Sequence, residues 1–289
     1  MRREMGLAVI FVVGVFGGVA AAGINIDTCG QMIPDKEVAV LTTDLHCAAG
    51  STAVKLGSGA TLNLNGHTID VPDGWGVWCL PATRCSVVGG GTGGAFGEIR
   101  GAETGVYLQS RARASINSVV IRDCVTGVEA EDWRAGRVGA SAELINVRIT
   151  GSTGTGVRVG RVKGENVIVT DNPGNGIAAG STSCLEAESL TVTRNATSAT
   201  CDVVGCSGID VGDLNARGLY VSDNAGLGIH ALTARLRSSA VVENRRAGAL
   251  RSLVISEAPN VRNVACDASF GWGSQSSVPW GVCSLDGSN

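Results

Sequence analysis

A glycine followed by a small or aliphatic residue recurs along most of the chain, and the side chains after it alternate between apolar and polar. The repeat glycines are Gly76, Gly105, Gly127, Gly156, Gly176, Gly208, Gly228 and Gly248. Their successive spacings are 29, 22, 29, 20, 32, 20 and 20 residues, so a base period of 20 to 22 residues is lengthened by insertions in some repeats. Such a period predicts stacked coils of chain, each of which contributes a short strand.

A second apolar element keeps step with the first, because a short alternating strand precedes most of the repeat glycines. These strands carry the pairs Val147/Ile149, Val167/Val169, Leu190/Val192 and Leu219/Val221. A polar residue follows each strand. In most repeats it lies four residues before the next repeat glycine; Asn195 lies at the same distance after its strand, but an insertion separates it from Gly208. These residues are Asp123, Ser152, Asn172, Asn195, Asn224 and Asn244. Asn, Asp and Gly tolerate sharp corners, and asparagines stacked about 4.8 Å apart can hydrogen-bond in a ladder, so we interpret this column as structural.

Composition narrows the choice of core and of partners. The 289 residues include 42 glycines but only 4% aromatic residues, so the core must be built from Val, Ile, Leu and Ala. The interior of a stack of short coils is narrow and has little room for aromatic rings, which explains why aromatic residues are scarce. The net charge of −3 includes no basic excess of the kind that neutralises phosphates, which argues against nucleic acid as a partner.

The N-terminus has the features of a secretory signal peptide over residues 1–22. Arg2 and Arg3 precede an apolar run over 6–22, which ends in the small residues Ala20, Ala21 and Ala22. The competing interpretation is a membrane anchor, because the run approaches the length that spans a bilayer. No other segment is long and apolar enough to cross a membrane. We therefore expect an exported protein that is secreted, periplasmic or held at the cell surface.

Ten cysteines, an even number in a chain predicted to be exported, favour disulfides over metal or redox chemistry. Their spacings suggest the local pairs Cys29 with Cys47, Cys79 with Cys85, Cys201 with Cys206, and Cys266 with Cys283. Cys124 and Cys184 are left over, and could pair across coils or remain buried thiols. A zinc site is the competing interpretation, but the chain has no C-x-x-C motif and its three histidines are not at ligand spacing, so we predict no metal site.

Three segments carry a resemblance to a known group. The run from Leu62 to Ile69 resembles the first-coil signature of secreted bacterial right-handed parallel β-helix proteins, the pectin-lyase-like fold. The opening Cys29-Gly30-Gln31 with Cys47 resembles them too, as does the closing Cys266-Asp267 with Trp280-Gly281-Val282-Cys283. The resemblance covers about residues 28–284.

Together with the repeat, the resemblance implies an all-β fold, a right-handed parallel β-helix with disulfide-stapled caps. We expect an N-terminal cap and first coil over 23–75, β-helix repeats over 76–262 and a C-terminal cap over 263–289 that includes Trp272 and Trp280. Caps would protect the open edges of the helix, which makes a monomer the simplest expectation.

The enzymes that share this fold have motifs that can be checked residue by residue. The R-x-P of pectate lyases is absent, because no proline has an arginine two residues before it. The D-P-H-E run of uronate epimerases is absent too, as are the Asp-Asp pair and the His-Gly of polygalacturonase-like hydrolases. Only Arg161-Val162-Lys163 matches the R-x-K of those hydrolases, a match that chance supplies easily.

One column of outward side chains is the candidate site. If the residue after each repeat glycine points inward, the next residue points outward, because side chains alternate along a strand. The outward residues are then Trp78, Tyr107, Glu129, Arg158, Ala178, Asp210, His230 and Leu250. Aromatic rings followed by acids and a histidine resemble a saccharide-binding strip. The alternative is an ordinary exposed sheet on which Glu129 pairs with Arg158 and Asp210 with His230.

The insertion after Glu129 is the other candidate, because it contains Trp133 and could fold over the same face. Two classes of function stay open. One is a non-catalytic exported β-helix that binds polysaccharide or serves as a cell-surface or structural component, without a cofactor. The other is a polysaccharide lyase or glycoside hydrolase with an atypical site, in which Asp210 and His230 would be the acid and base. Many lyases of this fold need calcium, but no cluster of aspartates here supplies a ready site, although Asp210 and Asp213 lie close together.

Overall fold

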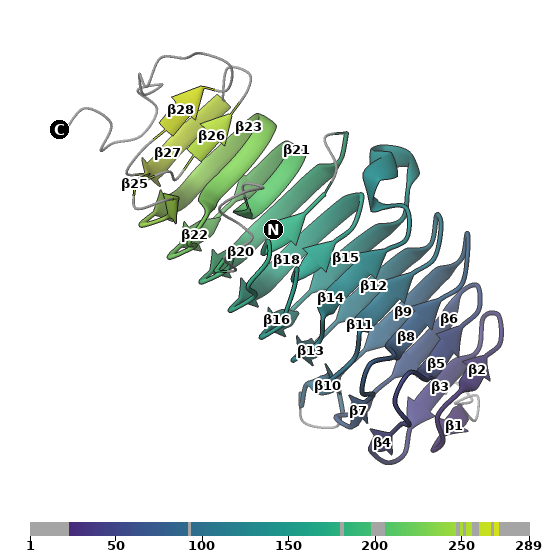
Figure 1. Cartoon of the computed structure of the whole chain (residues 1–289). Helices are drawn as coiled ribbons and strands as arrows, with labels where there is room; N and C mark the ends of the chain where they lie inside the picture. The colour runs from purple at the N-terminus through teal and green to yellow at the C-terminus, as the bar shows by residue number, and fades with distance from the viewer. Residues whose placement is uncertain are drawn as a thin grey trace, which may run out of the picture.

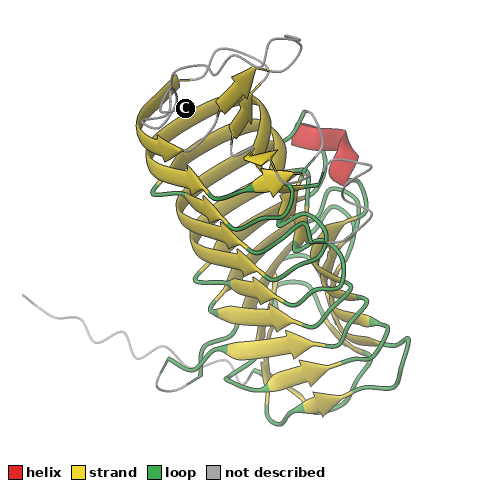
Figure 2. Ribbon diagram, turned by 60° about the vertical axis from the view of Figure 1, so that its left-hand side comes forward, coloured by secondary structure: helices red, strands yellow, loops and turns green. Residues whose placement is uncertain are grey.

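The computed structural model describes residues 23–91, 94–179, 182–197, 206–246, 249–250, 253–255, 260–266 and 269–271. These residues form an all-β protein, in which a single 3-10 helix, η1 (Trp133–Val138), is the only helical element of the described part. Figure 1 shows the strands stacked side by side along the long axis of the molecule, from β1 at one end to β28 at the other. Figure 2 shows η1 projecting from the side of the stack.

The strands form three ladders, through which the chain passes in turn, and neighbours within a ladder pair in parallel. The first ladder comprises β2 (Gln31–Ile33), β5 (Thr52–Leu56), β8 (Trp75–Cys79), β11 (Thr104–Leu108), β14 (Thr126–Ala130), β17 (Val157–Arg158), β19 (Ile177–Ala178), the starts of β21 (Ser207–Arg217) and β23 (Leu227–Val242), β26 (Leu253–Ile255) and β28 (Ser269–Gly271). The second ladder comprises β1 (Ile24–Ile26), β3 (Val38–Leu41), β6 (Ala60–Asn63), β9 (Arg84–Val88), β12 (Arg113–Asn117), β15 (Ser141–Ile145) and parts of five longer strands.

The third ladder comprises β4 (Leu45–His46), β7 (Thr68–Asp70), β10 (Gly97–Arg100), β13 (Val119–Arg122), β16 (Arg148–Thr150), β22 (Tyr220–Ser222) and the ends of longer strands. The five long strands bend from one ladder into the next: β18 (Arg161–Thr170), β20 (Cys184–Thr193), β21 (Ser207–Arg217), β23 (Leu227–Val242) and β27 (Asn260–Cys266). A short antiparallel pair, β24 (Arg245–Arg246) with β25 (Ala249–Leu250), stands outside the ladders. The first ladder includes the pair β2–β5, which lies within residues 23–75, the region expected to hold the N-terminal cap and the first coil.

Aliphatic side chains stack in columns to form the core. In the third ladder, one inward column is fully buried and consists of Ile69, Ile99, Ile121, Ile149, Val169, Val192, Val221 and Val241. Burying each such side chain is worth about 1.5–3 kcal/mol. The expectation of a core made of small aliphatic residues is confirmed.

The repeat glycines are required by a lack of space. A Cβ on Gly127 would lie 2.5 Å from the carbonyl oxygen of Gly156 in the next coil and 2.5 Å from Ile149 Cγ2 in the third ladder. A Cβ on Gly105 would lie 2.5 Å from Ile121 Cγ2 in the same way. At this corner the backbone of one coil meets the inward column of the third ladder, so only glycine fits without displacing either.

The asparagine column forms the predicted ladder in the interior. Asn172 Nδ2 donates to Asn195 Oδ1 at 2.8 Å, Asn195 Nδ2 to Asn224 Oδ1 at 3.1 Å, and Asn224 Nδ2 to Asn244 Oδ1 at 2.7 Å. Backbone N–H groups donate to the same oxygens, and Ser152 joins the ladder by donating its backbone N–H to Asn172 Oδ1 at 2.9 Å. All four asparagine side chains are buried, with no more than 1% exposed.

The position predicted for Asp123 in this column is wrong by one residue. Arg122 pairs with Thr150, so the coil equivalent of Ser152 is Cys124, which is buried, whereas Asp123 is exposed and contacts Arg122. Asp123 instead shares the left-handed corner conformation (φ 55°) with the residue before each ladder asparagine, such as Asp171 (φ 58°). The corner therefore uses two adjacent positions, a left-handed residue and then an inward polar one.

The disulfide predictions hold where the structure describes both cysteines. Cys29–Cys47 and Cys79–Cys85 are bonded. Cys206 and Cys266 are also disulfide-bonded, while Cys201 and Cys283 lie outside the described residues. Of the two alternatives for Cys124 and Cys184, the structure has thiols rather than a bond between coils. The predicted signal peptide (1–22), Trp272 and Trp280 lie outside the described residues, and no helix among those described is long and apolar enough to cross a membrane.

The Cys124 thiol is predicted to be inert in the folded protein. Burial raises the pKa of this thiol to about 12, so about one ten-thousandth of it is ionised at pH 8. In a Cys184→Ser background, we expect iodoacetamide at pH 8 to leave Cys124 unlabelled in the native protein and to label it fully in urea, as read by mass spectrometry. Equal labelling rates in the two conditions would contradict the burial of this residue.

Candidate functional site

The outward column of the first ladder lies in register as predicted from Trp78 to His230. Tyr107 pairs with Trp78 and with Glu129, and Arg158 pairs with Glu129. Ala178 then pairs with Arg158 and with Asp210, which pairs with His230. We call these seven residues the strip; apart from Ala178, which is buried, their side chains are partly exposed, and the buried residues of the same strands alternate with them.

Leu250, predicted as the next member of this column, is not part of it. The backbone of His230 pairs with Val254 in β26, whereas Leu250 belongs to the antiparallel pair β24–β25. The chain therefore inserts residues between these two coils that the 20-residue spacing of the glycines did not reveal.

Three aromatic rings gather at the N-terminal end of the strip. The ring centroids of Trp75 and Tyr107 lie 5.5 Å apart in a stacked arrangement, and that of Trp78 lies 4.7 Å from Trp75 and 6.0 Å from Tyr107, edge-on to both. Lys55 Nζ lies 5.3 Å from the centroid of Trp78, whose Nε1 donates to Gln109 Oε1 at 3.1 Å. The sequence interpretation missed Trp75, although it directly precedes the repeat glycine of the coil that carries Trp78.

Acidic residues beside the aromatic cluster affect the pKa of Tyr107. Burial raises the pKa of the Tyr107 phenol, and the carboxylates of Glu131, Glu129 and Asp132 raise it further. The phenol therefore stays protonated throughout the neutral range and can donate a hydrogen bond.

A charged pair and an aromatic ring occupy the middle of the strip. Glu129 Oε1 accepts a hydrogen bond from Arg158 Nη2, and Glu129 Oε2 accepts one from Thr104 Oγ1 at 3.1 Å. The Arg158 guanidinium carbon lies 5.7 Å from the ring centroid of Trp133. Arg158 Nε is buried and has no hydrogen-bond partner within the described part of the chain.

The insertion after β14 is held in place by one carboxylate. Asp132 Oδ1 accepts the backbone N–H of Ala140 at 2.8 Å, and Asp132 Oδ2 accepts that of Arg111 at 3.0 Å. These bonds tie both the end of the insertion and the preceding coil to the residue before η1. As a result Trp133, the first residue of η1, lies against the strip beside Arg158.

Asp210 and His230 form a separate pair at the C-terminal end of the strip. His230 Nδ1 and Asp210 Oδ1 are 2.9 Å apart in a hydrogen bond, with side-chain exposures of 24% and 38%. Ala178 separates this pair from Arg158, and two strand spacings amount to about 10 Å. Asp213, the other residue of the aspartate pair noted in the sequence, accepts from Thr233 Oγ1 at 2.6 Å. Among the described residues, no three His, Cys, Asp or Glu side chains gather so as to hold a metal ion.

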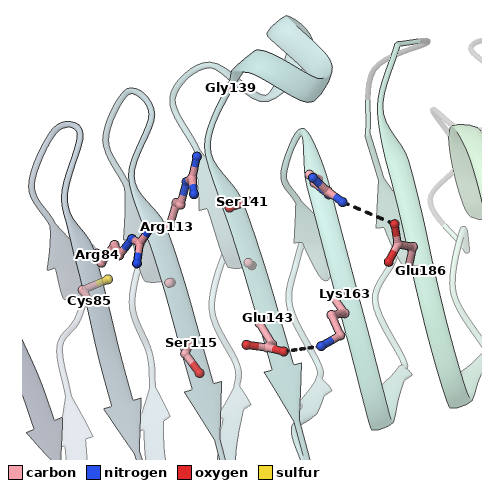
Figure 3. Close-up of a pocket in the computed structure, with 12 residues that line it drawn as sticks. Arg84, Cys85, Arg113, Ser115, Gly139, Ser141, Glu143, Lys163 and Glu186 are labelled. Atoms are coloured by element: carbon pink, nitrogen blue, oxygen red, sulfur yellow. Dashed lines mark hydrogen bonds and ion pairs between the residues drawn. The ribbon is translucent and has the colours of Figure 1, made fainter. Parts of the chain in front are cut away.

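A groove on the outward side of the second ladder was not predicted. It has a volume of about 380 Å³, and its charged lining residues are Arg84, Arg113, Glu143, Arg161, Lys163 and Glu186. Figure 3 shows Arg84, Arg113, Glu143, Lys163 and Glu186 on successive strands, with Gly139 at the rim below η1. Lys163 Nζ contacts Glu143 Oε1 at 2.7 Å, and Arg161 Nη2 contacts Glu186 Oε1 at 3.3 Å. The glycine repeat marks only the first ladder, so it carried no signal for this face.

The described residues thus define an all-β protein of stacked parallel strands with two polar outward faces, one aromatic at its N-terminal end and one grooved. Comparisons with models of known protein families, with curated proteins and with solved structures find no match.

Proposed function

We propose that this chain is an exported right-handed parallel β-helix of the pectin-lyase-like kind, which binds polysaccharide along the strip without catalysing a reaction. The chain passes through three parallel ladders in a fixed order, which supports the proposal of a β-helix. Connections between parallel strands are almost always right-handed, which supports the proposed handedness. Disulfides such as Cys29–Cys47 support export, because such bonds persist mainly in oxidising compartments.

The observation that carries the binding proposal is the aromatic cluster beside a fixed ion pair. Trp75, Trp78 and Tyr107 offer apolar ring surface on which the C–H face of a sugar can stack. One and two strand spacings further on, Glu129 and Arg158 are held in position and can exchange hydrogen bonds with hydroxyl groups. A saccharide lying along the stack would meet both kinds of surface in succession.

The arrangement of the carboxylates favours binding over hydrolysis. Glycoside hydrolases use two carboxyl groups on either side of the scissile bond. In the strip, Asp210 has Ala178 and His230 as its neighbours, and five strand spacings, about 24 Å, separate it from Trp78. An enzyme, a polysaccharide lyase or glycoside hydrolase, remains the second candidate, because the hydrogen bond of 2.9 Å between His230 Nδ1 and the Asp210 carboxylate orients the imidazole as a general base would require.

The proposal is tested by the binding of the mature protein to a panel of neutral and acidic polysaccharides. Trp78→Ala or Tyr107→Ala is expected to weaken binding about tenfold, since each removes a stacking surface worth about 1.4 kcal/mol. Tyr220→Ala is the matched control, because Tyr220 is 45% exposed on the third ladder, away from the strip. An equal loss in the control, or no binding to any glycan, would leave a structural surface protein as the better interpretation.

The enzyme alternative is tested in the same assay by following product release with and without calcium. No product is expected from the unsubstituted protein. If product forms and disappears in Asp210→Asn or His230→Ala while Trp78→Ala only weakens binding, the chain is a carbohydrate-active enzyme and the non-catalytic proposal fails.

A further inference from the structure

We propose that the groove on the second ladder is a second binding site, specific for the sulfate or phosphate ester groups of an anionic glycan, and that Arg84 and Arg113 hold this group. The site lies on a different face from the strip, so it does not depend on the function proposed for the strip.

The two arginines lie on neighbouring strands at the same register position. Arg84 in β9 pairs with Arg113 in β12, so their backbones are one strand spacing apart and both side chains are exposed on the groove side. Neither guanidinium forms an ion pair with an acidic side chain of the described part of the chain. Two unneutralised positive charges directly opposite each other destabilise a sheet, unless a ligand separates them.

Arginines in register also occur further along the second ladder, where Arg217 pairs with Arg237. At other places neighbouring coils hold opposite charges together, with Asp70 contacting Arg100 at 3.0 Å and Asp171 contacting Arg194 at 2.6 Å. Within the groove itself, Glu143 neutralises Lys163 and Glu186 neutralises Arg161. Four basic and two acidic side chains line the groove, so the two excess positive charges reside on Arg84 and Arg113.

The neighbouring groove of the second ladder is less unbalanced. It has a volume of about 490 Å³, and its charged lining comprises four basic side chains, Lys163, Arg217, Arg235 and Arg237, and three acidic ones, Glu165, Glu186 and Glu188. Arg217 and Arg237 are also in register there, but Glu165 and Glu188 are carboxylates of the same groove that are not engaged in any described ion pair. The larger excess of positive charge favours the groove with Arg84 and Arg113 as the anion site.

The geometry of the pair selects the type of anion. One guanidinium is sufficient to saturate both oxygens of a carboxylate, whereas a sulfate or phosphate ester presents three terminal oxygens and can bridge two guanidinium groups. The hydroxyl groups of Ser115 and Ser141 line the same groove and can donate to the remaining oxygen. A tetrahedral oxyanion ester therefore uses all four groups, while a uronate would leave one arginine without a partner.

The test compares one polymer carrying different charges. Binding of the mature protein is measured by calorimetry to sulfated, phosphorylated, carboxymethylated and unmodified dextran at equal charge density. We expect the sulfated or the phosphorylated form to bind at least about tenfold more tightly than the carboxymethylated form, and the better of the two identifies the source of the ester group. The affinity should fall as salt is added, because the site is exposed.

Substitutions then assign the effect to the two arginines. The double variant Arg84→Ser/Arg113→Ser is expected to lose about tenfold or more in affinity. The double variant Arg84→Lys/Arg113→Lys is expected to lose most of that affinity too, because lysine keeps the positive charge but lacks the planar guanidinium group. Arg148→Ser is the matched control, an exposed arginine of the third ladder with no acidic partner in the described chain. Trp78→Ala should bind the ester normally even if the strip proposal fails.

The proposal would be overturned if carboxymethylated dextran bound as tightly as the ester forms, if the lysine variant retained full affinity, or if the Arg148 control lost as much affinity as the double variant. Failure to bind any of the charged dextrans would overturn it as well.

Discussion

Replacing Asn195 by alanine is expected to lower the free energy of unfolding by about 3–5 kcal/mol, the largest effect predicted for any single side chain of this protein. Asn195 is fully buried, and its Oδ1 accepts both the backbone N–H of Asn172 at 3.1 Å and Asn172 Nδ2 at 2.8 Å. Its Nδ2 donates to the carbonyl oxygens of Val169 and Thr193. The truncation leaves the backbone N–H of Asn172 without its acceptor in the interior, where water does not replace it, and removes one hydrogen bond each from Asn172 Nδ2 and from the two carbonyl oxygens.

The measurement is urea denaturation followed by circular dichroism with the disulfides intact. Asn215→Ala is the matched control, because Asn215 is an exposed asparagine of β21 and is expected to change stability by less than about 0.5 kcal/mol. Similar midpoints for the two variants would show that the ladder contributes little, and that the apolar columns alone hold the coils together.

The second large effect is expected from Gly127→Ala, which should destabilise the protein by about 3 kcal/mol or more. The added methyl group would lie 2.5 Å from both the Gly156 carbonyl oxygen and Ile149 Cγ2. Neither neighbour can move easily, since the Gly156 carbonyl oxygen accepts the backbone N–H of Val128 at 3.0 Å and Ile149 is fully buried in the core. The backbone conformation itself is not the obstacle, because Gly127 does not have a positive φ.

Gly90→Ala is the control for this substitution. A Cβ on Gly90 meets nothing within 4 Å, so the change should be neutral or should stabilise the protein by about 0.4–1 kcal/mol. The stabilisation arises because alanine lowers the conformational entropy of the unfolded chain. Thermal unfolding of both variants checks the prediction. A Gly127→Ala protein as stable as the Gly90→Ala protein would mean that the coils can separate at this corner, and the spatial reason given for the repeat would be wrong.

The repeat made the first ladder predictable because side chains one coil apart share the same surroundings. Once Gly105 and Gly127 mark equivalent positions, Tyr107 and Glu129 must be neighbours, as they are. The same reasoning failed for Leu250, because an insertion between coils shifts the register and the residue count alone does not show where the insertion lies. It failed for Asp123 because a polar residue suits both positions of the corner, and only the pairing of Arg122 with Thr150 shows that Cys124 points inward.

The sequence by itself determined the all-β class, the aliphatic core, the asparagine ladder, two described disulfides and the order of side chains along the strip. The disulfides join cysteines that are close in the sequence, 18 and 6 residues apart. The other features depend on contacts between equivalent positions of successive coils, which a period in the sequence makes visible. Only the tertiary structure decided that the equivalent residues Arg84 and Arg113 line a groove, and which non-equivalent residues meet: Trp75 with Tyr107 and Trp133 with Arg158. Such contacts depend on the rotation of side chains and on the path of an insertion, and no local pattern of hydrophobic and polar residues encodes either.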